Sequence, residues 1–310
     1  MQVRFWGVRG SIPCPGPQTV RYGGNTTCIE VRGDDGTLVI LDAGTGIFPF
    51  AQALLKELPV MPHIFVTHTH WDHIQGLPFF TPFYIPGNRV HLYGPFDVVA
   101  QRGIERVMDV QMQYSYFPIR EAELRAQLDY TTVQPNVVVE VGSLKITPLL
   151  LNHPVANLGY RIDGDGSALF FTGDHEPWRN IYEPHDEGYA DFARMVEEQE
   201  RQLDEALRGV ELLIADCAYT RAEYPAKVGW GHGTLEGALA WAKGLQVSTL
   251  VCTHHEPTRS DDALDTVFAA ALEQCGYAPG EGGAPAVHLG REGLVLSVRG
   301  RESALSSSVD

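Results

Sequence analysis

Short apolar runs separated by glycine- and proline-rich turns make up most of the first half of the chain. The apolar run at 38–42, for example, closely follows the turn Gly33-Asp34-Asp35-Gly36. Such runs of apolar, β-branched and aromatic residues between turns are typical of β-strands. The pattern predicts strands at residues 3–8, 27–32, 38–42, 63–67, 89–93, 137–141, 144–150, 159–162 and 168–172.

Segments with helical character lie between and after these strands. Residues 97–128 contain helical material, and residues 186–208 carry enough charge to form a helix with a solvated face. A helix is also expected at 47–58, with Pro49 in the first turn, where proline is tolerated. The other predicted elements are helices at 234–243 and 261–275 and strands at 211–216, 249–253 and 287–298.

These elements favour a single mixed α/β domain. No repeat or linker divides the chain, and such a mixture of strands and helices is expected to form two sheets with helices outside. The predicted domain spans 1–300 and has helical insertions near 97–128 and 177–209. The tail at 301–310 is expected to be loose.

Composition and charge narrow the expected partners and location. The 310 residues carry a net charge of −16 and show no basic footprint of the kind that long nucleic acids require. The charge argues only against long polyanions, and a small anionic substrate remains the expected partner. The sequence has neither an apolar stretch of about 18 residues for a membrane span nor the pattern of a secretion signal. Five cysteines without a close pair indicate reduced thiols and hence a cytoplasmic protein, with no membrane partner expected.

Potential metal-binding side chains are most concentrated in the run His68-Thr69-His70-Trp71-Asp72-His73. Three imidazoles and a carboxylate within six residues need polar partners, which either a metal ion or a solvated loop provides. The run follows a predicted strand, so His68 and His70 point one way from an extended chain, and Asp72 and His73 can face a second centre from the next turn. These donors suit Zn²⁺, Mn²⁺ or Fe²⁺, with Zn²⁺ as the first expectation.

This run resembles the HxHxDH signature of the metallo-β-lactamase superfamily, and further superfamily landmarks follow in order along nearly the whole chain. The resemblance implies an αββα sandwich, in which two mixed β-sheets flanked by helices hold two divalent metal ions at one edge. Asp42 matches a carboxylate that buttresses the metal loop. The implied first metal site comprises His68, His70 and His153, and the implied second comprises Asp72, His73 and His254, with Asp174 shared.

A second histidine follows His254, and the resemblance does not decide between the two. We expect His254 to be the ligand because it comes directly after the predicted strand and Thr253. His255 then either supports the ligands from behind or faces the substrate.

His232 is the candidate for contact with the substrate. It lies between Gly231 and Gly233 before a predicted helix, in a segment similar to the GHST segment of ribonuclease Z and related phosphodiesterases, where this histidine contacts phosphate. Gly233 replaces the serine of that segment. Asp216 ends a predicted strand and resembles the acidic residue of the same branch's HEAT segment. Asp216 either holds His232 in the correct tautomer or only caps the strand end.

The resemblance implies a dinuclear metal hydrolase similar to the branch that includes ribonuclease Z and class II cyclic-nucleotide phosphodiesterases. Two divalent ions about 3.5–4 Å apart can hold a bridging hydroxide at neutral pH, which Asp72 would orient while His232 assists the departing oxygen. A small or cyclic phosphodiester is the favoured substrate. The alternatives are a lactonase or esterase on the same metal site, ribonuclease Z-like RNA processing, and a binding module without catalysis. A homodimer is compatible with the resemblance.

Other residues near these motifs are less specific. Arg9 and Asn25 lie in glycine-rich turns, and turn formation explains both without a role in the site. His175 and Glu176 follow Asp174 and either support the site or only form a loop. Core packing explains a nearby aromatic set better than a pocket wall does; its members are Trp71, Phe79, Phe80, Phe83 and Tyr84.

Overall fold

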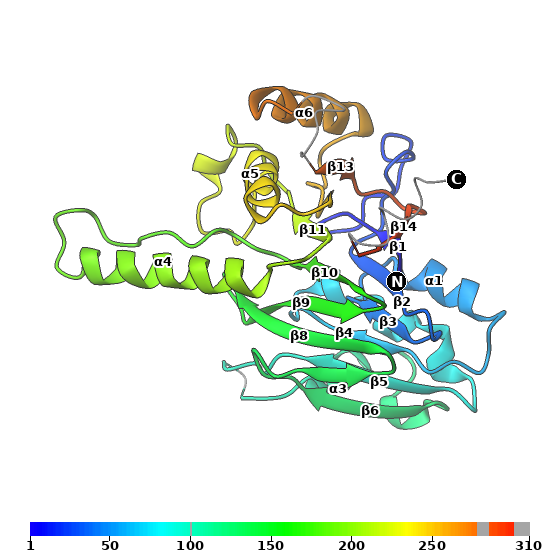
Figure 1. Ribbon diagram of the computed structural model, residues 1–310. Coiled ribbons are helices and arrows are strands. Elements are labelled where there is room, and N and C mark those ends of the chain that lie inside the picture. The colour runs from blue at the N-terminus through cyan, green and yellow to red at the C-terminus, as the bar shows by residue number, and fades with distance from the viewer. Residues whose placement is uncertain (100, 278–284, 301–310) are drawn as a thin grey trace.

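Two seven-stranded β-sheets lie face to face in the computed structural model, with helices on their outer surfaces (Figure 1). The structure describes residues 1–99, 101–277 and 285–300. This arrangement confirms the predicted αββα sandwich of two mixed sheets. The predicted loose tail at 301–310 lies outside the described residues.

The first sheet has the strand order β14-β1-β2-β3-β4-β5-β6. Strands β14, β1, β2 and β3 pair antiparallel, whereas β3 to β6 run parallel. The strands are β1 (Gln2–Gly7), β2 (Cys28–Arg32), β3 (Leu38–Leu41), β4 (His63–Phe65), β5 (Arg89–Gly94), β6 (Gln127–Thr132) and β14 (Val295–Ser297).

The second sheet has the strand order β13-β12-β11-β10-β9-β8-β7. Its strands β7 to β10 pair antiparallel, and β10 to β13 run parallel. The strands are β7 (Val139–Val141), β8 (Leu144–Leu151), β9 (Asn157–Gly164), β10 (Ser167–Phe171), β11 (Leu212–Asp216), β12 (Thr249–Thr253) and β13 (Ala286–Leu289).

The strands divide their side chains between a central core and two outer layers. In β11, Leu212 and Ile214 pack between the sheets, whereas Leu213 and Ala215 pack in the outer layer that contains α5. Strands that are covered on both faces are continuously apolar, which made them the most readily predicted elements. The helices are α1 (Ile47–Leu54), α2 (Trp71–Ile74), α3 (Glu105–Gln111), α4 (Tyr189–Ala206), α5 (Leu235–Leu245) and α6 (Asp261–Gln274).

The structure corrects the predicted elements in three places. Strand β6 is not predicted, because its sequence QLDYTT has little apolar character and this edge strand is only partly buried. The predicted helix at 47–58 ends at Leu54. The predicted strand at 287–298 is in fact two strands, β13 and β14, which belong to different sheets, so the end of the described chain completes both sheets.

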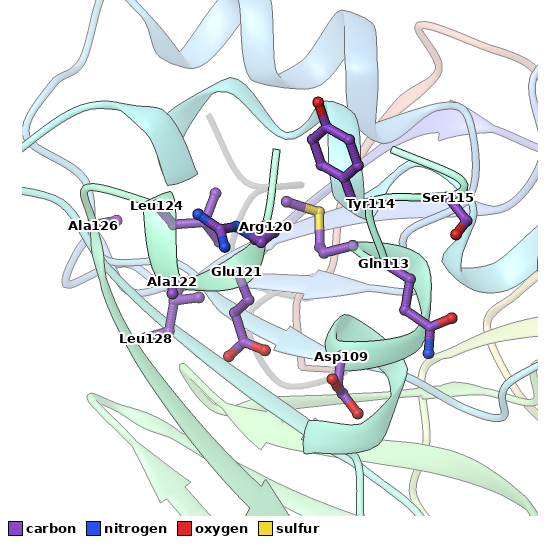
Figure 2. Close-up of a pocket in the computed structure, with 11 residues that line it drawn as sticks. Asp109, Gln113, Tyr114, Ser115, Arg120, Glu121, Ala122, Leu124, Ala126 and Leu128 are labelled. Carbon is purple, nitrogen blue, oxygen red and sulfur yellow. The ribbon is translucent and has the colours of Figure 1, made fainter. Parts of the chain in front are cut away.

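The two predicted insertions form different structures. The segment 97–128 contains α3 and a 3₁₀ turn at Glu121–Glu123, and it borders an open cavity of about 800 Å³. Figure 2 shows side chains that line this cavity, among them Asp109, Arg120 and Glu121. The segment 177–209 forms a loop and the long helix α4, which extends away from the sheets in Figure 1. Across the described parts of the chain, no helix is both long and apolar enough to span a membrane.

Candidate metal centre

All seven predicted metal ligands gather at one edge of the sandwich, just beyond the ends of strands. The parallel strands β10, β11 and β12 end side by side, as the carboxyl ends of neighbouring parallel strands do in open sheets. The ligands are His68 and His70 after β4, Asp72 and His73 in α2, His153 after β8, Asp174 after β10 and His254 after β12.

The first group of potential ligand atoms consists of three imidazole nitrogens and one carboxylate oxygen. Nδ1 of His70 lies 3.0 Å from Nε2 of His68 and 3.1 Å from Nε2 of His153. Oδ2 of Asp174 lies 3.5 Å from Nε2 of His68. These four residues form a group able to hold a metal ion, and they are the set that the resemblance implied for the first site.

The second group combines two imidazoles and two carboxylates, all buried. Nε2 of His73 lies 3.2 Å from Oδ2 of Asp72 and 3.2 Å from Oδ1 of Asp174. Nε2 of His254 lies 3.3 Å and 3.1 Å from the same two oxygens. Because Asp174 turns Oδ2 to the first group and Oδ1 to the second, its carboxylate is placed to bridge two ions.

The hydrogen bonds around these residues fit metal binding. Nδ1 of His73 donates to Asp42 at 2.7 Å, and Nδ1 of His153 donates to the Gly231 carbonyl at 2.9 Å. Each bond fixes a tautomer whose Nε2 lone pair faces the site, as is usual for histidines that bind metals. Nε2 of His73 and Oδ1 of Asp174 are buried and make no hydrogen bond in the described structure. Buried polar atoms need a partner, and a divalent ion would satisfy both.

The electrostatics of the two groups differ. Burial lowers the pKa of His68, His70 and His153, so these rings keep their lone pairs at neutral pH. Burial also disfavours the charged form of His254, but Asp174 and Asp216 outweigh it and raise the pKa of His254 to about 9. The second group therefore holds a proton that a bound cation would displace.

Local backbone strain helps to position the second group. His254 and Asp42 both have positive φ, at 57° and 59°, a conformation that costs a side-chain-bearing residue about 1–3 kcal/mol. Asp42 also accepts a 2.7 Å hydrogen bond from the Thr67 amide, immediately before the metal loop. Gly10 packs against the His254 ring so closely that a Cβ there would lie 2.2 Å from Nδ1 of His254. The surrounding loops thus fix the histidine in an otherwise unfavourable conformation.

His232 and Asp216 form a pair beside the metal ligands. Nδ1 of His232 donates to Oδ2 of Asp216 at 2.9 Å and lies 3.7 Å from Oδ2 of Asp174. The His232 ring stacks on that of His254, with the ring centroids 4.6 Å apart. Asp216, His232, Asp174 and His254 also form a third group able to hold a metal ion. The geometry therefore fits the predicted role of Asp216, which is to hold His232 in one tautomer. It is also compatible with His232 as a metal ligand.

Two contacts that support the site could not be specified from the sequence. The Ser11 amide donates a 2.7 Å hydrogen bond to Oδ2 of Asp72. Glu176 is buried and accepts hydrogen bonds from the amides of Gly229 and Gly231 and from the Tyr224 hydroxyl. Glu176 therefore holds the loop that leads to His232, which favours the supporting role among its two predicted roles.

Replacing Glu176 with glutamine should lower the free energy of unfolding by about 1–3 kcal/mol, because the new amide group would face a backbone N–H and leave it unsatisfied. Urea denaturation measures this change. Glu187→Gln, at an exposed position later in the same loop between β10 and α4, is the matched control and should leave the stability unchanged. Equal stability of the two variants would show that the loop does not depend on the Glu176 carboxylate.

Arg9 and the predicted aromatic set have mainly structural roles. Arg9 is fully buried and donates to the carbonyls of Gly23 and Arg259, so it joins loops instead of facing the site. Phe80 and Phe83 are in the core, as expected. Trp71 and Phe79, in contrast, are 79% and 54% exposed and are not packed in the core.

His255 differs from its neighbour His254 in every contact. It is fully buried, and its Nε2 donates to the Gly290 carbonyl at 2.8 Å. It belongs to none of the groups that could hold an ion. This geometry favours His254 as the ligand and excludes a substrate-facing His255 in this conformation.

Replacing His255 with alanine should leave the bound metal unchanged and lower the free energy of unfolding by about 1–3 kcal/mol, since the buried Gly290 carbonyl loses its partner. Metal analysis and urea denaturation of the same preparation test both parts. Loss of one metal ion per chain would instead identify His255 as a ligand.

The comparisons with known proteins agree with this geometry. Residues 37–255 match the family described as "Beta-lactamase superfamily domain". The chain is 24% identical over 164 residues to ribonuclease Z of Staphylococcus epidermidis, a match that covers 53% of this chain and 49% of that protein. The chain thus spans about half the length of the curated relatives that it matches.

Two solved structures share the fold along almost the whole chain. A diphosphatase from the PhnP family has a TM-score of 0.61 at 21% identity, with 96% of this chain and 97% of that chain covered. Zinc-bound PqqB from Methylobacterium extorquens has a TM-score of 0.61 at 18% identity, with 96% and 100% covered. The family match extends over most of the chain and includes the HxHxDH run, and the protein therefore belongs to the metallo-β-lactamase superfamily.

Proposed function

We propose that the protein is a metal-dependent phosphodiesterase that cleaves a small or cyclic phosphodiester. The observation that carries this proposal is the His232–Asp216 pair, which lies beside the carboxylate placed between the two ligand groups. A metal site alone suits many hydrolytic reactions, because function depends on the site and not on the fold. A histidine oriented by a carboxylate adds a group that can contact phosphate.

When bound, two divalent ions would acidify a water molecule and neutralise charge on the phosphoryl group. Zinc is the expected metal, since histidine and carboxylate ligands suit it and a structural relative was solved with zinc. The shared Asp174 carboxylate would hold both ions in place. Asp72, which accepts a hydrogen bond from Ser11, would orient the attacking water.

His232 would act at the leaving group. Its Nδ1 is engaged by Asp216, so Nε2 is the nitrogen that can contact a phosphate oxygen and transfer a proton to the departing oxygen. The Asp216 carboxylate would stabilise the protonated ring. Asp216 ends β11 of the second sheet and His232 lies in the loop just before α5, so their 2.9 Å contact keeps the pair in a fixed position beside Asp174.

The charge of the protein supports a small substrate. The net charge is −16, and α4, which extends from the second insertion, carries several carboxylates on its surface. A long RNA would be repelled by such a surface. We therefore prefer a small phosphodiester to the precursor RNA suggested by the name of the ribonuclease Z relatives.

The test is hydrolysis of bis(p-nitrophenyl) phosphate compared with a nitrophenyl ester and a lactone, with metal content measured on the same sample. We expect turnover of the diester with about two metal ions per chain. Turnover of the ester or lactone alone would assign acyl chemistry to the same metal site. Two bound metals without any turnover of this panel would remove the support for phosphodiester cleavage.

A further inference from the structure

A second cavity, of about 280 Å³, lies beside the His232–Asp216 pair, between α4, α5 and the ends of β10 and β11. Asp216 and Gly233 form part of its wall, but none of the seven proposed metal ligands lines it. The cavity is therefore separate from the metal centre, although Asp216 belongs to both.

Aromatic rings form one part of the cavity wall. The ring of His175 lies 5.3 Å from that of Trp178 and 5.8 Å from that of Trp241, measured between centroids. His175 is only 8% exposed, and its Nδ1 makes no hydrogen bond within the described structure. The faces of tryptophan rings attract cations, so this wall suits a positively charged ligand.

Carboxylates form another part of the wall. Glu200 and Asp204 lie one helical turn apart on α4, and both line the cavity. Like charges at this spacing repel each other. The intervening Arg201 does not neutralise them, because it pairs with Glu198 and Glu205. Nε1 of Trp241 donates to Asp204 at 2.8 Å, which joins the aromatic and acidic parts of the wall.

The charges of this cavity are of one sign. Its described lining residues include Glu200, Asp204 and Asp216 but neither lysine nor arginine. The larger cavity in Figure 2 is different, because the cation Arg120 lies among its lining carboxylates. The charged residues that line the smaller cavity are therefore all acidic, whereas those of the larger cavity include a cation.

We propose that the cavity between α4 and α5 binds a small organic ammonium ion. The tryptophan rings would pack against its alkyl groups, and Glu200 and Asp204 would balance its charge. A ligand bound there would also contact the wall that carries Asp216, directly beside His232. This binding site goes beyond the proposed phosphodiesterase activity and does not depend on it.

Choline, titrated into the full chain at fixed salt concentration, is the probe. Its binding is measured by saturation transfer from the protein to the choline methyl protons. The neutral isostere 3,3-dimethyl-1-butanol has the same shape without the charge. We expect choline to bind at least about tenfold more tightly than this alcohol, because its charge would face aromatic rings and carboxylates. Equal binding of the two compounds, or no detectable choline binding, would overturn the proposal.

Variants locate the bound choline. Trp178→Leu and Glu200→Gln should each weaken choline binding by about threefold to thirtyfold. Glu197→Gln is the matched control on the same helix, and Trp230→Leu is the control for loss of an exposed tryptophan; neither residue lines the cavity. An unchanged thermal unfolding temperature confirms that each variant is folded. We expect Glu200→Gln to fold normally because the Glu200 side chain is exposed. If both cavity variants bind choline as the controls do, the ion binds elsewhere and the assignment is wrong.

Discussion

Replacing Asp174 with asparagine should remove at least one metal ion per chain and reduce hydrolysis by about 10³-fold or more. Among the described residues, Asp174 alone contributes an oxygen to both the first and the second group of ligand atoms. Asparagine has nearly the same shape but lacks the charge and one of the two acceptor oxygens. The side chain could then serve only one ion, and the buried histidines around it would lose a compensating negative charge.

Metal content by elemental analysis and kcat/KM on the same preparation test this prediction. Asp129→Asn is the matched control, because Asp129, on the edge strand β6, pairs with Arg89 of β5 and belongs to none of the ligand groups. The control should retain both metals and full activity. An Asp174→Asn protein with two metals and normal turnover would contradict the bridging role and the two-ion centre based on it.

The metal loop is the part of the site that the sequence predicts best. Four donors occur within six residues, so local chain conformation alone brings His68, His70, Asp72 and His73 close together. The other ligands are single residues after strands, and each by itself is unremarkable. Only their order along the chain, compared with the superfamily pattern, singled them out. The structure explains the order, because β8, β10 and β12 of the second sheet place the residues that follow them near the metal loop.

The supporting contacts depend on long-range packing and have no sequence pattern. The Ser11 amide meets a carboxylate 61 residues away, and Glu176 accepts from amides 53 and 55 residues away. Every residue except proline has a backbone N–H, so the residue types do not show which amides will donate to a distant carboxylate. Such pairs cannot be recognised before the fold is known. The prediction missed β6 for a different reason, because a half-buried edge strand lacks the apolar run that marks a central strand. At the chain end the pattern predicted strand residues but could not show that β13 and β14 pair in different sheets.

The His232–Asp216 pair was only partly predictable from the sequence. Glycines on both sides made His232 a candidate, and Asp216 was recognisable as an acid at the end of a strand. The sequence left open whether the two residues meet. The structure places them 2.9 Å apart because β11 ends at Asp216 and α5 starts just after His232, against the same edge of the sheet. It also places His232 near enough to Asp174 to leave two roles, proton transfer and metal binding, for experiment to separate.

Replacing His232 with alanine should leave both metal ions bound and reduce turnover by about 10²–10⁴-fold, the usual contribution of a proton-transfer group. Asp216→Asn should give a smaller loss of kcat, because the histidine remains but loses its orienting carboxylate. His185→Ala is the matched control, since that histidine is exposed in the loop before α4.

The split between metal content and rate distinguishes the two roles of His232. A proton donor matters most for a substrate with a poor leaving group, so the defect of His232→Ala should be larger for an alkyl phosphodiester than for a nitrophenyl diester, whose leaving oxygen needs little help from an acid. If His232 is instead a metal ligand, His232→Ala should bind one ion fewer per chain and lose the same proportion of its turnover on both substrates. If His232→Ala loses metal but keeps its rate per bound metal, the histidine belongs to the third ligand group, and the leaving group must be protonated by another residue.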